Sequence, residues 1–196
     1  MSTQNYIPII DSGHGYNTTG KQSKGFYNPD GTVELKENSV NEAVANKLSM
    51  VYYLNDKEAK FISNEWNDIS LSERVRREHG IYDLLKAQNK TPLFLSLHAD
   101  AFRIKNGAKG GRFFYFSDSG RVIAEQLTNY LRTHGYDIEL REPKRANFKV
   151  LRETHSPAVL FEMGFMTTRE DLDKLKSDDF RNKTAKLLYD AIENLY

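Results

Sequence analysis

Apolar residues along the chain form two kinds of pattern, short β-type runs and longer stripes with helical spacing. The β-type runs occupy residues 6–10, 58–63, 91–98, 110–116 and 157–161. Apolar residues at steps of three and four predict helices that begin near residues 35 and 71 and that cover residues 119–134, 168–175 and 180–196. Strands that alternate with helices are typical of α/β domains. The pattern therefore predicts one α/β domain over residues 1–196, with a mostly parallel central sheet flanked by helices.

Local signals mark the ends of several elements. The run at residues 91–98 is apolar on both faces, as expected of a central parallel strand. Ser70, followed three residues later by Glu73, matches a capping box at a helix N-terminus. Gly135 is a suitable stop at a helix C-terminus. Residues 16–32 are rich in turn-forming residues and predict a long loop, and loops of this length in compact domains are often functional.

Composition excludes several classes of function. Lys and Arg number 28 against 27 for Asp and Glu, so the net charge of +1 does not favour nucleic acid as a partner. Because the chain has no cysteine, a metal site would have to use His, Asp or Glu. No apolar run approaches the roughly 20 residues that span a bilayer, so no stable membrane insertion is expected. The short polar N-terminus does not resemble a signal peptide.

Residues able to ligate a metal or move a proton follow three of the predicted strands. The first strand runs into His14, the third into His98 and the last into Glu162. In open α/β sheets, ligands bind at the carboxyl ends of the strands, so parallel neighbours would bring these side chains to one edge. Glu37 projects from the apolar face of the first helix, where a buried carboxylate requires a partner or a cation.

Two imidazoles and one carboxylate, from His14, His98 and Glu37, form the three-ligand set of catalytic zinc sites. Such sites leave the fourth position to water, whose pKa falls towards about 7. A nearby carboxylate can then take the proton of the water and pass it to a leaving amine. Glu162 fits this catalytic role. The spacing of the four residues matches no compact metal motif.

Each of these residues also has an alternative interpretation without catalysis. His14 lies between two glycines and could be an exposed turn residue, and His98 could be a hydrogen-bonded histidine at a strand end. Glu37 could complement the helix dipole. Glu162 could be a structural ion-pair partner. Arginines at positions 74, 145 and 152 are candidates for contact with substrate carboxylates or for ordinary salt bridges.

Four segments resemble the zinc-dependent N-acetylmuramoyl-L-alanine amidases of the amidase 3 type. They are Ile-Ile-Asp-Ser-Gly-His-Gly at 9–15, the helix that opens with Glu-Asn-Ser-Val at 37–40, Leu-Ser-Leu-His-Ala-Asp at 95–100, and Pro-Ala-Val-Leu-Phe-Glu-Met-Gly-Phe at 157–165. The resemblance implies that zinc is the cofactor and that His14, Glu37 and His98 are its ligands. It implies that Glu162 is catalytic, and it gives no further cofactor-binding residue.

The same resemblance implies a substrate and a site of action. The expected reaction is hydrolysis of the amide between N-acetylmuramic acid and the L-alanine of the stem peptide in bacterial peptidoglycan. The active site is expected at the C-terminal edge of the strands. Without a signal peptide, the enzyme would reach the wall as a lysin released from the cytoplasm, as phage endolysins do, or would be a chain trimmed of its leader.

Departures from the family pattern and rival functions remain open at this point. Tyr16 stands where the family has a second glycine, and Asp100 where Asn is common. A zinc peptidase or deacetylase acting on another cell-wall amide, or a non-catalytic wall-binding module, would share the fold. Residues 15–21 nearly spell a phosphate-binding loop, but Gln22 replaces the hydroxyl residue and no helix is predicted there, so no nucleotide is expected. The oligomeric state is not predicted.

Overall fold

The computed structural model describes residues 5–63, 65–101 and 107–196. Six strands form one sheet in the order β2-β1-β3-β6-β4-β5. The strands are β1 (Tyr6–Ser12), β2 (Lys60–Ser63), β3 (Thr91–Asp100), β4 (Arg112–Tyr115), β5 (Lys144–Arg145) and β6 (Ala158–Phe165). All neighbouring strands are parallel except β4 and β6, which are antiparallel. The predicted α/β fold with a mostly parallel sheet is confirmed.

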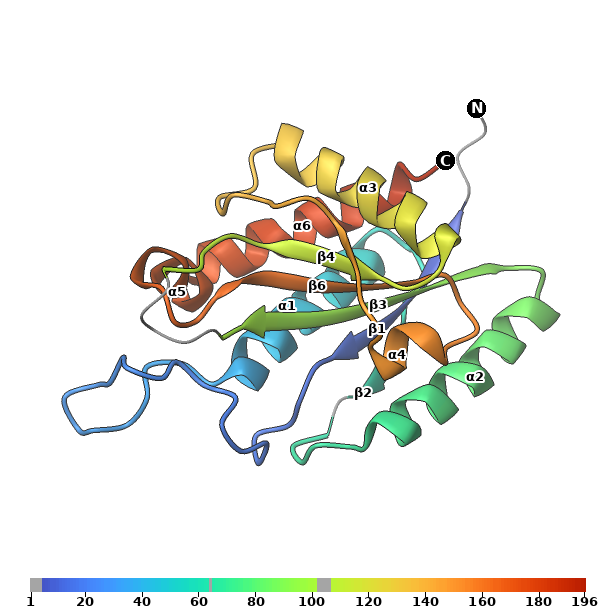
Figure 1. Ribbon diagram of the computed structural model, residues 1–196. Helices are drawn as coiled ribbons and strands as arrows, with labels where there is room; N and C mark the ends of the chain where they lie inside the picture. The colour runs from blue at the N-terminus through green and yellow to red at the C-terminus, as the bar shows by residue number, and fades with distance from the viewer. Residues whose placement is uncertain (1–4, 64, 102–106) are drawn as a thin grey trace.

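Helices cover both faces of this sheet (Figure 1). One face packs against α1 (Glu37–Leu54), α3 (Asp118–Thr133), α5 (Arg169–Lys176) and α6 (Asp178–Glu193). The other face packs against α2 (Leu71–Ala87) and the short helix α4 (Lys149–Arg152). On this second face α2 contacts β1, β2 and β3, and α4 contacts β6.

Alternation along β3 divides the core between the two faces. Leu93, Leu95 and Leu97 pack with α1 and α6 in the larger core, whereas Phe94 packs with α2 in the smaller one. Because side chains alternate across a strand, Ser96 and His98 follow Phe94 onto the α2 face. The smaller core thus changes to polar side chains at the carboxyl end of the strand.

Two helix ends can be compared with local signals in the sequence. Ser70 Oγ accepts a hydrogen bond from the Glu73 backbone N–H at 3.1 Å, as an N-cap should. The Glu73 carboxylate pairs with two arginines of α2 instead of completing a capping box. Gly135, with φ of 81°, ends the segment after α3 in the left-handed conformation that glycine tolerates.

Two strands continue beyond the ends that the sequence predicts. β3 extends to Asp100, and β6 extends to Phe165, so Glu162 lies within β6 and does not mark its end. The residues after Glu162 are buried and remain paired or hydrogen-bonded at the sheet edge, which is why the strand continues. None of the helices in the described part of the chain is long and apolar enough to cross a membrane.

Candidate active site

Three adjacent parallel strands bring the predicted residues to one edge of the sheet. β3 lies between β1 and β6, and Ser96 pairs with Asp11 on one side while His98 pairs with Glu162 on the other. His14 follows the end of β1, where the Gly13 N–H donates to the carbonyl of Leu97 at 3.0 Å. The topology therefore brings both histidines and Glu162 together on neighbouring strands, towards the carboxyl-end edge of the sheet.

The turn that carries His14 has an unusual backbone. His14 has φ of 63°, a left-handed conformation that is uncommon for any residue other than glycine. The turn is tied to α1 by Asn41 Nδ2, which donates to the Gly13 carbonyl at 3.0 Å. A Cβ atom on Gly13 would lie 2.2–2.6 Å from ring atoms of His98, so only glycine allows this close approach. The local sequence thus fixes the relative placement of the two rings.

Glu37, the first residue of α1, joins the two rings. Its side chain is 2% exposed, and its Oε1 lies 2.9 Å from His98 Nδ1 and 3.4 Å from His14 Nε2. The two imidazole rings meet edge to face with centroids 4.9 Å apart. One ligand atom from each residue lies within 4.8 Å of the others, so the three side chains could hold one metal ion.

Hydrogen bonding around His98 fits a cation at this position. Ser96 Oγ donates to Asp11 Oδ2 at 2.6 Å, since a carboxylate only accepts. Its single proton is thus used, and the hydroxyl accepts from His98 Nε2, 3.2 Å away. In the neutral ring the lone pair is then on Nδ1, which faces the Glu37 carboxylate. Two electron-rich atoms at this distance require a proton or a cation between them.

His14 gives a second sign of the same requirement. Its Nε2 is buried and makes no hydrogen bond within the described part of the chain. Burial alone would raise the pKa of Glu37, but the contacts with His14 and His98 lower it. Burial lowers the pKa of His98, whereas Glu37 and the charge of Glu162 raise it, and the net change is upward. The cluster therefore favours an ionised carboxylate with positive charge beside it.

Glu162 has the opposite electrostatic environment. Burial raises the pKa of this carboxyl to about 8; His98 acts against the rise, and the charges of Glu37 and Asp100 add to it. Its Oε2 is buried and has no hydrogen-bond partner among the residues that the structure describes. A carboxyl group with a pKa near neutrality can both accept and release a proton at working pH. Perturbed carboxyl groups of this kind cluster at functional sites.

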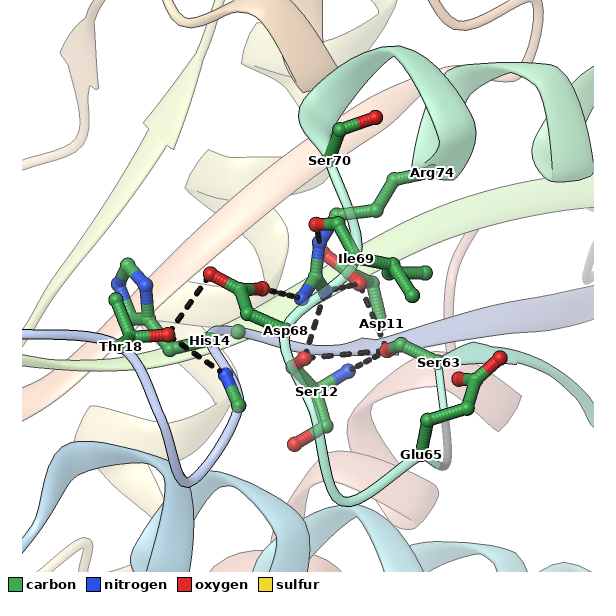
Figure 2. A network of polar contacts seen from close by, with 12 residues as sticks. Asp11, Ser12, His14, Thr18, Ser63, Glu65, Asp68, Ile69, Ser70 and Arg74 are labelled. Carbon is green, nitrogen blue, oxygen red and sulfur yellow. Dashed lines mark hydrogen bonds and ion pairs between the residues drawn. The ribbon is translucent and has the colours of Figure 1, made fainter.

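A cleft of about 350 Å³ opens beside the two histidines. Its apolar wall includes Ile69, which lies just before α2, Leu71, the first residue of α2, and Val150 of α4. Residues at the polar end include Thr18 and Asp68, near His14 (Figure 2). The cleft gives a substrate access to the histidine pair from the α2 side.

Arg74 belongs to a buried salt bridge, which is the second of the two interpretations that the sequence allowed. Its side chain is 3% exposed and pairs with Asp11 and Asp68. Arg152 pairs with Glu153, and Arg145 Nε donates to the Phe116 carbonyl at 3.0 Å. The network of Arg74 with Asp11 and Ser96 is not anticipated by the sequence analysis. Its signal in the sequence is weak: Asp11 follows the apolar run of one strand, and Ser96 interrupts that of another.

The loop at residues 15–21 does not form a phosphate-binding site. It continues into further loop, and the next helix, α1, begins only at Glu37. Lys21 Nζ lies 3.6 Å from Glu37 Oε2, so its charge faces the buried carboxylate. The helix N-terminus that would hold a phosphate after such a loop does not follow it.

Known proteins are similar to this chain in sequence and in fold. The chain is 28% identical over 197 residues to the uncharacterised protein YqiI of Bacillus subtilis, covering 95% of this chain and 83% of the relative. It is also 28% identical over 194 residues to the N-acetylmuramoyl-L-alanine amidase LytC of B. subtilis, covering 96% of this chain but only 35% of LytC.

A solved structure and a family model complete the comparison. The crystal structure of an N-acetylmuramoyl-L-alanine amidase from Clostridium difficile 630 superposes with a TM-score of 0.79 at 24% identity, covering 97% of this chain and 96% of that one, and so has the same fold. The model of the Amidase_3 family, described as N-acetylmuramoyl-L-alanine amidase, matches residues 9–194. The chain therefore belongs to the Amidase_3 family of cell-wall amidases.

Proposed function

We propose that this chain is a catalytic amidase domain that hydrolyses the amide bond between N-acetylmuramic acid and the L-alanine of the peptidoglycan stem peptide. The observation that carries the proposal is the meeting of His14, Glu37 and His98 within 4.8 Å at the same sheet edge as Glu162. The family match supports the bond that is cleaved.

His14, Glu37 and His98 would hold a zinc ion. Their donor set, two imidazoles and one carboxylate, is the set found in catalytic zinc sites that keep one position open. When bound, zinc polarises a carbonyl group as a Lewis acid and lowers the pKa of water towards about 7. Support comes from the Nε2 of His14, which is buried and makes no hydrogen bond among the described residues, and from the Nδ1 of His98, which faces the Glu37 carboxylate.

Glu162 would act as general base and then as general acid. As a base, the carboxylate takes a proton from the attacking water, whose oxygen forms a bond to the lactyl carbonyl carbon. As an acid, the carboxyl returns that proton to the alanine nitrogen when the C–N bond breaks. The products are a free carboxylic acid on the sugar and a free amine on alanine. Burial supports both roles because it brings the pKa of Glu162 close to neutrality.

The proposed biological role is degradation of the bacterial cell wall, in the manner of a lysin. The cleft beside His14 and His98 has the apolar side chains of Ile69 and Val150 in its wall, which suits the methyl groups of a lactyl-alanine unit. Zinc dependence and lysis of whole cells are part of the proposal.

The test is digestion of purified peptidoglycan with and without a chelator, with the new end groups identified by mass. The expected result is free N-terminal alanine that appears only when zinc is available. Release of acetate would identify a deacetylase, and new ends within the stem peptide a peptidase. A chain that binds the polymer and releases no new end would be a wall-binding module. Each of these three results would contradict the proposal.

A further inference from the structure

Arg74 is buried between two carboxylates at the base of the candidate site. Its Nη1 donates to Asp11 Oδ1 and, at 2.7 Å, to the Ser12 carbonyl. Its Nη2 donates to Asp68 Oδ1 at 2.8 Å (Figure 2). Burying a charged arginine is costly unless it is paired and hydrogen-bonded. Here each terminal nitrogen of the guanidinium group is paired with a different carboxylate. Each acid has a second oxygen that points away from Arg74 to a hydroxyl group.

The first carboxylate leads to His98. Asp11 Oδ2 accepts from Ser96 Oγ at 2.6 Å, and Ser96 Oγ lies 3.2 Å from His98 Nε2. Because the Asp11 carboxylate can only accept, Ser96 Oγ donates its proton to Asp11, and His98 Nε2 must donate to Ser96 Oγ. This arrangement fixes which ring nitrogen of His98 carries a proton. It turns Nδ1, the other nitrogen, towards Glu37.

The second carboxylate leads to the turn of His14. Asp68 Oδ2 accepts from Thr18 Oγ1 at 2.8 Å, and Thr18 Oγ1 in turn accepts from the Gly15 backbone N–H at 3.0 Å. Gly15 follows His14, whose φ of 63° needs support from its surroundings. A Cβ on Gly15 would lie 2.1 Å from the backbone nitrogen of Asp68, so the turn and the segment before α2 are in direct contact.

We propose that Arg74 is a positioning residue for both histidines, acting through Asp11 and Ser96 on His98 and through Asp68 and Thr18 on His14. The inference rests on the proposed function, since it assigns these histidines to a metal ion. It goes further in naming the residues that orient them. Partners that orient metal-ligating histidines typically contribute about 10–100-fold to metal affinity.

The experiment interrupts each path at its hydroxyl group, because removal of Arg74 itself would leave Asp11 buried without its partner. Ser96→Ala interrupts the path to His98, and Ser63→Ala is its matched control. Ser63 Oγ also donates to Asp11, at 2.9 Å, but it contacts neither ring. Thr18→Ala interrupts the path to His14, and Thr18→Ser, which keeps the hydroxyl group, is its control.

Two measurements on the full chain separate positioning from folding. The first is the zinc dissociation constant by competition with a chelator. The second is the protonated ring nitrogen of His98, read by ¹⁵N NMR in the zinc-free protein at a pH at which the ring is neutral. Ser96→Ala and Thr18→Ala are expected to weaken zinc binding by about tenfold or more, whereas Ser63→Ala and Thr18→Ser bind as the unchanged chain does. In the unchanged chain and in Ser63→Ala, the neutral His98 ring is expected to carry its proton on Nε2. In Ser96→Ala, the ring is expected to lose this preference for the Nε2 tautomer.

The proposal is overturned if Ser96→Ala keeps both the zinc affinity and the Nε2 proton, or if each control weakens binding as much as its partner variant. If the unchanged chain does not bind zinc, the proposed function fails by itself. In that case the NMR result still decides whether Asp11 and Ser96 orient His98, and an Nδ1 proton in the unchanged chain would refute that orientation.

Discussion

One oxygen of Glu37 faces both histidine rings, and this contact defines the site at the scale of single residues. His98 Nδ1 and His14 Nε2 lie 2.9 Å and 3.4 Å from that oxygen. Glu162, next to His98 across the sheet, has a raised pKa, whereas that of Glu37 is lowered. Two glutamates in one site thus have opposite protonation tendencies, as the proposed roles of Glu37 as a cation ligand and of Glu162 as a proton-exchanging group require.

The residue-scale prediction concerns Glu162. Glu162→Gln keeps the shape of the side chain but can neither take nor return a proton, so turnover of peptidoglycan is expected to fall by at least about 100-fold. Zinc content is expected to stay near one ion per chain, because Glu162 is outside the proposed ligand set. Turnover and zinc content are measured on the same preparation. Unreduced turnover would remove Glu162 from the role of base, and loss of zinc would make it a ligand.

Particular residues show why part of the site is evident in the sequence. His14 and His98 are recognisable because each follows a short apolar run, and the order of the strands then brings them together. The pairing of Asp11 with Ser96 depends on the register between two strands that are far apart in sequence. No local pattern encodes that register, so the buried network around Arg74 emerges only in the folded chain.

At the scale of elements, helices and strands with a clear apolar period agree with the sequence analysis, and their ends agree less well. Glu162 does not end β6, because Met163 and Phe165 continue the buried run beyond it. β5 and α4, of two and four residues, are too short to carry a period and are absent from the sequence-based assignment. Residues 102–106, between β3 and β4, lie outside the described part of the chain.

The element-scale prediction concerns the anchor between the long loop before α1 and helix α5. Glu34 is 11% exposed and pairs with Arg169 at 2.8 Å and with Lys176 at 2.5 Å. Hydrogen bonds from Arg169 and then Lys176 lower the pKa of Glu34 from 4.5 to about 2. Because the pKa of Glu34 is lower in the folded chain than in the unfolded chain, its ionisation stabilises the folded state at pH values above the unfolded pKa. This contribution is lost as pH falls towards about 2.

Glu34→Gln is therefore expected to lower the urea midpoint of unfolding near neutral pH, and the difference from the unchanged chain should shrink as pH is lowered to about 3. Glu139→Gln, at an exposed glutamate, is the control and should show no such trend. A difference that stays constant with pH, or that grows towards acid, would rule out the ion pairs as the cause.

At the scale of the whole molecule, the candidate ligands come from the end of β1, the start of α1 and the end of β3. These three segments are adjacent only in the folded state, so a cation that needs all three binds the native chain in preference to the unfolded one. Binding to the native state alone stabilises it by about 2.7 kcal/mol when free ligand is 100 times the dissociation constant. The free energy of unfolding therefore reports on the site without any substrate.

Addition of zinc to the metal-free chain is expected to raise Tm by roughly 5–10 °C at that saturation. Glu37→Gln, which replaces the carboxylate that both rings face, is expected to remove most of the rise. Differential scanning calorimetry over a zinc series measures both. An equal rise in the two proteins would place the bound zinc elsewhere on the chain.

The positions of His14 and Glu37 also have a topological consequence for the segment between them. They lie at its two ends, and the segment, residues 15–36, is irregular apart from two isolated β-bridges. A cation held by both residues would close this segment into a ring, as a disulfide does in secreted proteins. In a chain without cysteine, such a cross-link through a cation would restrict the conformations of the segment. A chelator would break this cross-link, whereas a reducing agent would not.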